Sequence, residues 1–506
     1  METARIVVHP ALVVGDIDRR LFGSFIEHLG RAVYGGIYEP DHPTAGLDGF
    51  RTDVLDLVRE LNVSVVRYPG GNFVSAYDWR DGIGPVASRP ARLDLAWRST
   101  EPNLVGINEF MAWAGRAEVE VDLAVNLGTG GIDGARELLE YCNHPGGTYW
   151  SDLRRSHGVT KPHGVRLWCL GIEMDGRWQI GHKTADDYGR LAAQTAIAMK
   201  LVDPTIELVA CGSSHINMPT FPQWDATVLE HTYDYVDYVS LHTYYRNDDD
   251  DLGSFLAQSV SMDRYIDAVV ATCDFIQARK RSSKRLFLAF DEWNVWYHST
   301  AADRETTTNH PWQIGPPLLE ERYTLEDALV VGCMLISLLK HADRVKIACL
   351  AQLVNVIAPI TTVNGGGAWR ETIFFPFMHA SHFGGGTVLA LQVTSPAYSN
   401  DALGEIPLLE AVATYRAEET ELTIFAVNRR QDGPLALQGD LRAFQTLQVV
   451  EHLVLEHADP KAANTADRPD KVTPHAGGDA IVADGVLTTH LPRLSWNVIR
   501  LRGPLD

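Results

Sequence analysis

The chain has 506 residues, and its 44 lysines and arginines against 65 aspartates and glutamates give a formal net charge of −21. This acid excess argues against binding of nucleic acid or an anionic membrane, because both depend on clustered basic side chains. The 45% hydrophobic and 22% charged residues are typical of a globular protein with a large core. The length suggests about three domains, or fewer if one is a barrel of about 250 residues.

Membrane spans and secretion signals are not expected. No run of about 18 apolar residues occurs, and an acid at Glu2 with no long apolar stretch after it does not resemble a secretory signal. The six cysteines are scattered, with no CxxC pair and no zinc-ligand spacing. We therefore predict buried free thiols in a protein of the reducing cytoplasm.

The first three quarters of the chain alternate short β-branched runs with amphipathic helical patterns, such as 50–61 and 185–199. This alternation predicts parallel strands joined by right-handed crossovers. Eight units over about 330 residues fit a (β/α)₈ barrel better than an open sheet, so we predict an α/β fold built on a TIM barrel. The predicted strands are 21–26, 64–68, 119–127, 165–170, 207–211, 236–242, 286–290 and 345–350.

From about residue 385 the pattern changes to alternating segments separated by Asp, Gly and Pro turns. This predicts a C-terminal antiparallel β-sandwich, jelly-roll-like in character. Residues 4–14 are also strand-like and are expected to pair with the C-terminal sheet. The expected division is 1–18 for N-terminal strands joining the sandwich, 19–384 for the barrel and 385–506 for the sandwich.

Polar residues that directly follow barrel strands gather at one mouth of the barrel and are the first candidates for catalysis. Glu173 follows the fourth predicted strand and Glu292 the seventh. Two facing carboxyls can hydrolyse a glycosidic bond, one as acid and the other as nucleophile or base. A single glutamate more often caps a helix or pairs with an arginine, but the Trp, Tyr, His and Asn residues nearby favour a catalytic pair.

Long distinctive motifs lie at 22–28, 67–73, 77–79, 176–183, 290–297 and 351–355. They resemble those of the α-L-arabinofuranosidases of glycoside hydrolase family 51, and the resemblance spans nearly the whole chain. It implies a (β/α)₈ barrel with a β-sandwich, hydrolysis with retention of configuration, no cofactor and often a hexamer. The implied substrate is a terminal non-reducing α-L-arabinofuranosyl unit of hemicellulose-derived oligosaccharides.

Carried over position by position, the resemblance makes Glu173 the general acid/base and Glu292 the nucleophile. Tyr244 and His242 have the alternative of being hydrogen-bonded core residues, Trp97 and Trp178 of plain packing, and Asn72 of shaping a turn. Arg67 either orients a carboxylate or touches the sugar. The positions expected around the sugar are Glu27, Asn72, Trp97, Ile172, Trp178, His242, Tyr244 and Gln352.

Ile172 departs from the family pattern, in which an asparagine precedes the acid/base and donates to the sugar 2-OH. Isoleucine has no donor, so a contact that strengthens in the transition state is lost. Three hypotheses follow: a working, slowed arabinofuranosidase; a variant in which transglycosylation competes with hydrolysis; and a non-catalytic carbohydrate-binding homologue.

No metal site is expected, because no His, Asp and Glu cluster shows ligand spacing along the chain. The acidic run 248–251 is interpreted as a solvated loop rather than as a cation site.

Overall fold

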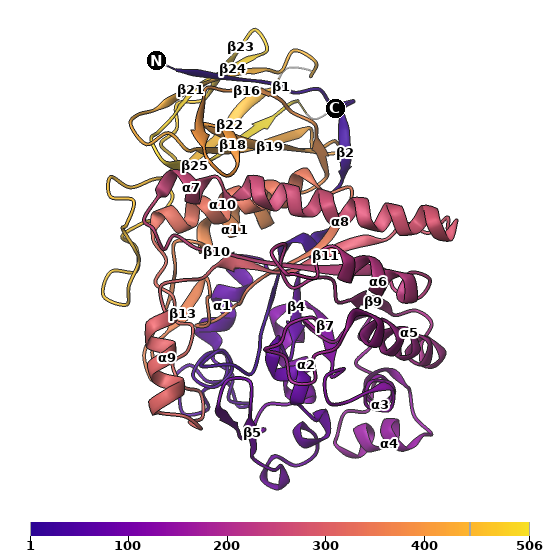
Figure 1. Ribbon diagram of the computed structural model, residues 1–506. Coiled ribbons are helices and arrows are strands. Elements are labelled where there is room, and N and C mark those ends of the chain that lie inside the picture. Colours follow the sequence, from indigo (N-terminus) through magenta and orange to yellow (C-terminus); the bar gives the residue numbers. More distant parts are fainter. Residues whose placement is uncertain (1, 445–446, 505–506) are drawn as a thin grey trace.

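The fold was analysed in a computed structural model that describes residues 2–444 and 447–504. A β-sandwich lies at one end of the molecule and a barrel surrounded by helices forms the rest (Figure 1). The predicted fold class is confirmed.

Eight parallel strands close the barrel in chain order. Most are buried on both faces, which explains why they form nearly continuous apolar runs in the sequence. They are β3 (Gly23–Phe25), β4 (Val65–Tyr68), β7 (Glu120–Val125), β8 (Leu167–Leu170), β9 (Glu207–Ala210), β10 (Tyr238–Tyr245), β11 (Phe287–Val295) and β12 (Val345–Leu350).

All eight predicted strands are present, but two are longer than predicted. β10 and β11 run to Tyr245 and Val295 rather than to residues 242 and 290, and they stay paired over that extension. The sequence predicts earlier ends for these two strands because polar residues interrupt their apolar runs there. Tyr244 and Glu292 therefore lie within strands, which holds them more firmly than a loop would.

Helices follow most of the barrel strands and cover the outside of the barrel (Figure 1). The predicted helical patterns at 50–61 and 185–199 correspond to α1 and α5. The helices are α1 (Thr52–Leu61), α2 (Ile107–Ala117), α3 (Ile132–Asn143), α4 (Tyr149–Ser156), α5 (Ala185–Val202), α6 (Gln223–Thr232), α7 (Leu252–Leu256), α8 (Gln258–Lys280), α9 (Thr300–Asn309), α10 (Leu325–Lys340) and α11 (Phe374–Phe383).

Two antiparallel-rich sheets form the sandwich, and N-terminal strands take part in both. One sheet has the order β16 (Gln392–Thr394), β1 (Thr3–Val7), β21 (Leu435–Asp440), β24 (Val486–Leu491) and β23 (Ile481–Ala483). The other has the order β2 (Val13–Asp16), β15 (Thr387–Leu389), β19 (Leu409–Arg416), β20 (Glu421–Asn428), β25 (Ser495–Arg502) and β22 (Gln448–Leu455).

Three two-stranded hairpins complete the described strands. They are β5 (Arg92–Asp94) with β6 (Ser99–Glu101), β13 (Ile360–Thr362) with β14 (Ala368–Arg370), and β17 (Ala397–Asn400) with β18 (Gly404–Pro407).

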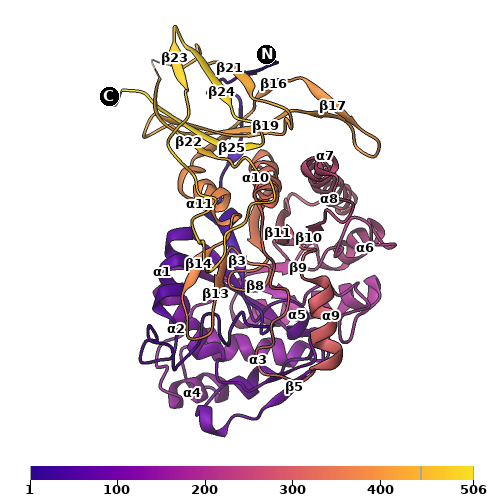
Figure 2. The same cartoon turned by 90° about the vertical axis from the view of Figure 1, so that its left-hand side faces the viewer.

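Helix α10 joins the two parts of the molecule, because it lies between the barrel and the β19–β20–β25 face of the sandwich (Figure 2). Residues 325–339 are all buried, as expected of a helix that is covered on every side. Its first turn is capped by Thr324 and Asp327.

All six cysteines are buried free thiols, as predicted. Among the described residues, no helix is long and apolar enough to cross a membrane.

Candidate active site

The two predicted catalytic glutamates face the same cavity of about 530 Å³. Strand β11 carries Glu292, and Glu173 follows β8 in a short loop. Glu173 has a φ of +48°, a left-handed conformation that is rare outside glycine, asparagine and aspartate and is often found at functional sites.

Six further residues that line this cavity were also predicted from the sequence. The sequence-predicted lining residues are Glu27, Asn72, Trp97, Glu173, Trp178, Tyr244, Glu292 and Gln352. His242 and Ile172 are not among the lining residues. His242 lies behind the carboxyls and binds them, whereas Ile172 is 2% exposed in an apolar cluster with Phe25, Val74 and Ala124.

Glu292 is held by two donors. Arg67 Nη2 donates to its Oε1 at 2.5 Å and the Tyr244 hydroxyl donates to its Oε2 at 2.7 Å. Arg67 also donates from Nη1 to Asp291 Oδ2 at 3.0 Å. Arg67 therefore orients carboxylates, which is one of the two roles expected for it from the sequence.

Glu173 has different neighbours. Trp178 Nε1 donates to its Oε2 at 2.5 Å, and His242 Nδ1 lies 2.9 Å from its Oε1. Burial raises the pKa of Glu173, and these two hydrogen bonds only partly oppose the rise. A carboxyl with a raised pKa can keep its proton near neutral pH, which suits a general acid.

His242 connects both carboxyls to Asp291. Its Nε2 is 3.2 Å from Asp291 Oδ1, and its Nδ1 is 3.6 Å from Glu292 Oε2. Burial alone would lower the His242 pKa, but the surrounding charges of Glu292, Asp291 and Glu173 raise it well above the usual value. The ring is therefore a charged donor to the carboxyls on both sides.

Glu27 and Gln352 form a second polar group on the cavity wall. Glu27 Oε1 accepts from the Phe73 backbone N–H and from Trp97 Nε1, both at 2.8 Å. Gln352 Nε2 donates to Glu27 Oε2 at 3.3 Å. Burial raises the pKa of Glu27 to about 8, so at neutral pH this carboxyl is a neutral acid that can donate as well as accept.

Two glycines, Gly70 and Gly71, allow the backbone before Asn72 to pass close to Glu27. Gly70 has a φ of +117°, and a Cβ there would lie 2.2 Å from Glu27 Cβ. At Gly71 a Cβ would come within 3.0 Å of Glu27 Oε2 and 3.4 Å of Glu292 Oε1. Asn72, which follows them, accepts from Gln179 Nε2 at 2.5 Å. A side chain at either glycine would push Glu27 out of place.

Sequence reasoning missed several residues of this site. Trp296 lines the cavity and meets Tyr244 edge to face, with ring centroids 5.6 Å apart. Its position four residues after the predicted nucleophile Glu292 could have identified it as a cavity residue. His215 and Ser214 also line the cavity, and the loop after β9 that carries them has no distinctive motif.

Among the residues that the structure describes, three potential metal ligands come together in a way that chain spacing did not predict. Glu173, His242 and Glu292 each offer a ligand atom, and these atoms lie within 4.8 Å of one another. The three residues come from the loop after β8, from β10 and from β11, so no sequence spacing reveals the cluster. The hydrogen bond between His242 and Glu173 accounts for part of this proximity.

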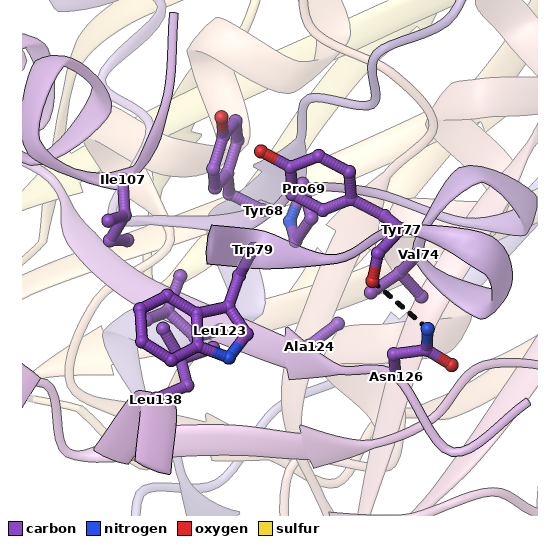
Figure 3. Close-up of a pocket in the computed structure, with 10 residues that line it drawn as sticks. All are labelled: Tyr68, Pro69, Val74, Tyr77, Trp79, Ile107, Leu123, Ala124, Asn126 and Leu138. Carbon is purple, nitrogen blue, oxygen red and sulfur yellow. Dashed lines mark hydrogen bonds between the residues drawn. The ribbon is translucent and has the colours of Figure 1, made fainter. Parts of the chain in front are cut away.

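A second, smaller cavity lies between barrel strands β4 and β7 and helices α2 and α3 (Figure 3). Its volume is about 30 Å³, enough for one or two waters. Near it, Asn126 Nδ2 donates to the Tyr77 carbonyl at 3.0 Å. Neither catalytic candidate lines it. The lining residues are Tyr68, Pro69, Val74, Tyr77, Trp79, Ile107, Leu123, Ala124, Asn126 and Leu138.

Comparison with known proteins decides the family. The model of the α-L-arabinofuranosidase 1 domain matches residues 57–267, and that of the α-L-arabinofuranosidase C-terminal domain matches residues 291–495. An intracellular exo-α-(1→5)-L-arabinofuranosidase of Halalkalibacterium halodurans is 60% identical over 499 residues, covering 99% of each chain. The chain belongs to the family 51 α-L-arabinofuranosidases.

Further relatives of this arabinofuranosidase support its family membership. A Bacillus subtilis protein, named intracellular exo-α-(1→5)-L-arabinofuranosidase 1, is 58% identical over 502 residues and is covered to 99%, as is this chain. The solved structure of a family 51 α-L-arabinofuranosidase from Bifidobacterium longum superposes with a TM-score of 0.95 at 44% identity, covering 99% of this chain and all of that one. The protein is therefore a glycoside hydrolase, and its barrel-plus-sandwich fold is that of its family.

Proposed function

We propose that this arabinofuranosidase is a retaining, exo-acting enzyme that works by double displacement. The observation that supports this best is the distance between the two carboxyls, since an oxygen of Glu173 and one of Glu292 lie within 4.8 Å. Retaining glycosidases hold their carboxyls about 5–5.5 Å apart, whereas inverting enzymes leave about 6.5–9.5 Å for a water.

In the first step, Glu292 attacks the anomeric carbon and the bond to the leaving oxygen breaks. Glu173 gives its proton to that oxygen, so the leaving sugar departs as a neutral alcohol. In the second step, ionised Glu173 takes a proton from water, whose oxygen attacks the anomeric carbon. Glu292 is released as a carboxylate and Glu173 is again protonated.

The surroundings of the two carboxyls suit these opposite roles. Glu173 is buried and has a raised pKa, while Arg67 and Tyr244 donate to Glu292. Neutral Glu27, Asn72 and Gln352 are proposed to bind the sugar hydroxyls. Trp178, which is 48% exposed beside Glu173, is proposed to stack on the leaving sugar.

The proposed substrate is the terminal non-reducing α-L-arabinofuranosyl unit of a hemicellulose- or arabinan-derived oligosaccharide. The names of the Halalkalibacterium halodurans and Bacillus subtilis relatives support exo action, α-(1→5) linkages and an intracellular location. We propose the same linkage and a cytoplasmic location here. A hexamer is proposed on family resemblance, and light scattering of the purified protein measures it.

The test is the release of arabinose from p-nitrophenyl α-L-arabinofuranoside and from an α-(1→5)-linked arabinotriose. The proposal predicts turnover of both and removal of one arabinose at a time from the triose. The Glu292→Ala variant should lose all turnover, because no other group can form the glycosyl-enzyme. Absence of turnover in the unaltered protein would instead support a carbohydrate-binding homologue.

A second candidate function is transglycosylation, and Ile172 favours it. Ile172 is buried in an apolar cluster, so the chain has no donor where the family's asparagine binds the 2-OH. The lost contact is expected to slow water-dependent turnover by on the order of 10²-fold, and a retaining intermediate can pass to another acceptor.

The Ile172→Asn variant tests this with p-nitrophenyl α-L-arabinofuranoside and a sugar acceptor present. We expect the asparagine variant to hydrolyse on the order of 10²-fold faster and to make proportionally less transfer product. Equal rates and equal product ratios would show that Ile172 does not limit hydrolysis.

A further inference from the structure

A buried carboxyl lies in the barrel interior below the catalytic pair and takes no part in the proposed reaction. Asp122 on β7 is fully buried, and its Cα pairs with that of Arg67 on β4. Its Oδ1 and Oδ2 lie 3.4 and 3.2 Å from Cys169 Sγ. The Cys169 thiol is thus a hydrogen-bond donor to Asp122.

The same thiol has a second carboxylate neighbour. Cys169 Sγ lies 3.7 Å from Asp291 Oδ2, so it stands between Asp122 and Asp291. Burial raises the pKa of Cys169 well above its usual value, and the thiol keeps its hydrogen. One thiol hydrogen cannot be donated to both carboxyls at once.

Asp291 connects this pair to the site. It accepts from Arg67 at 3.0 Å and lies 3.2 Å from His242 Nε2, and the other ring nitrogen of His242 is 2.9 Å from Glu173. A continuous chain of contacts therefore runs from Asp122 through Cys169, Asp291 and His242 to Glu173.

Asp122 is able to change its charge near neutral pH. Burial and the negative charge of Asp291 raise its pKa to about 7. The charged or titratable groups that face it are Asp291 from β11, Arg67 from β4, Cys169 from β8, Cys349 from β12, and Arg20 from the turn before β3.

We propose that Asp122 and Cys169 are positioning residues, which share one thiol hydrogen with Asp291 and so set how strongly Asp291 holds His242 against Glu173. When Asp122 is ionised, it takes the thiol hydrogen and adds a negative charge below His242. The His242 ring is already charged, so the added negative charge acts on Glu173, from which it disfavours proton loss. The proposal rests on the acid/base role proposed for Glu173.

The test is the pH dependence of kcat/KM for an α-(1→5)-linked arabinotriose, whose leaving sugar needs a proton from Glu173. The alkaline limb of that profile reports proton loss in the free enzyme. The Asp122→Asn variant removes the charge but keeps the shape, so the limb should move to lower pH by about half a unit. The control is Glu371→Gln. Glu371 is another buried acid with a pKa of about 8, but it bonds Thr361 and Trp369 outside the site, and its variant should keep the limb in place.

A second pair of variants keeps the test decisive if Asp122→Asn does not fold. Cys169→Ala removes the donor, which favours neutral Asp122 and should move the limb in the same direction. Cys169→Ser keeps a donor hydrogen and should restore the original profile. A limb that stays in place in Asp122→Asn and Cys169→Ala, or that moves equally in Cys169→Ser and Cys169→Ala, would overturn the proposal.

This outcome is separate from failure of the acid/base assignment. If Glu173 is not the acid/base, the Glu173→Ala variant will lose activity equally on substrates with good and with poor leaving groups. That result does not depend on the Asp122 and Cys169 variants. A merely structural role of Asp122 would lower kcat or stability without moving the limb.

Discussion

Glu173 and Glu292 lie close together, but each carboxyl has its own set of neighbours. Glu292 accepts from a guanidinium and a phenol, while Glu173 is buried against Trp178 and the His242 ring. Burial raises the pKa of Glu173, while Arg67 and Tyr244 orient Glu292. Different surroundings of this kind let one residue type supply both the proposed acid and the proposed nucleophile.

The acid role predicts an uneven loss in the Glu173→Ala variant. Turnover of arabino-oligosaccharides should fall by about 10²–10⁴-fold, the usual contribution of general acid catalysis. An aryl arabinofuranoside with a good leaving group needs little protonation, so its first step should be spared, and added azide should rescue its turnover. Steady-state rates on both substrates measure this, and an equal loss on both would remove Glu173 from the acid role.

Individual site residues could be predicted from the sequence where a polar residue directly follows a predicted barrel strand. Glu173, Glu292, Glu27 and Gln352 were found in this way. Contacts between distant strands were not predictable. The Arg67–Asp291 ion pair joins residues 224 positions apart. Ile172 is likewise buried in an apolar cluster with residues of other elements, such as Phe25 and Ala124.

Helix α10 and strand β19 hold the sandwich against the barrel through a buried charge cluster. Glu410 on β19 binds Lys340 at the end of α10, and Arg429 Nη2 donates to Glu410 at 2.6 Å. Burial alone would raise the pKa of Glu410, but Lys340 and Arg429 lower it to about 2. The folded state therefore strongly favours the ionised form.

The Glu410→Gln variant should lose about 3 kcal/mol of unfolding free energy, because it leaves buried cations without their counter-charge. The folded pKa is below the ordinary value of 4.5, so this stabilisation is present above about pH 4.5 and is lost as the pH falls toward about 2. Urea unfolding at several pH values, followed by tryptophan fluorescence, measures both effects.

The matched control is Glu451→Gln, which breaks a more exposed pair with Arg500 at 2.8 Å and should cost less than about 1 kcal/mol. KM should not change in either variant, because neither Glu410 nor Glu451 lines the active-site cavity. If Glu410→Gln unfolds at the same urea concentration as Glu451→Gln, the buried cluster does not stabilise the junction.

Most elements could be predicted because buried parallel strands are apolar runs and amphipathic helices have a regular period. The ends of β10 and β11 could not, since Tyr244 and Glu292 are polar residues kept inside strands by pairing. The all-round burial of α10 also depends on the sandwich that packs on it, which its own sequence does not reveal.

Over the whole molecule, the substrate site and the sandwich lie apart. The β5–β6 hairpin, next to cavity residue Trp97, is at the end of the molecule opposite the sandwich (Figure 1). The proposed catalytic and sugar-binding residues therefore all come from the barrel part of the chain, and β1 and β2 join the N-terminal segment to the sandwich.

The central proposal is that the two carboxyls act by double displacement, and trapping the intermediate with methanol tests it most directly. The enzyme would be incubated with p-nitrophenyl α-L-arabinofuranoside in aqueous methanol, and proton NMR would assign the first methyl arabinofuranoside formed. Two displacements at the anomeric carbon predict the α-anomer. Formation of the β-anomer would contradict the account, since it requires a single displacement in which Glu292 never bonds to the sugar.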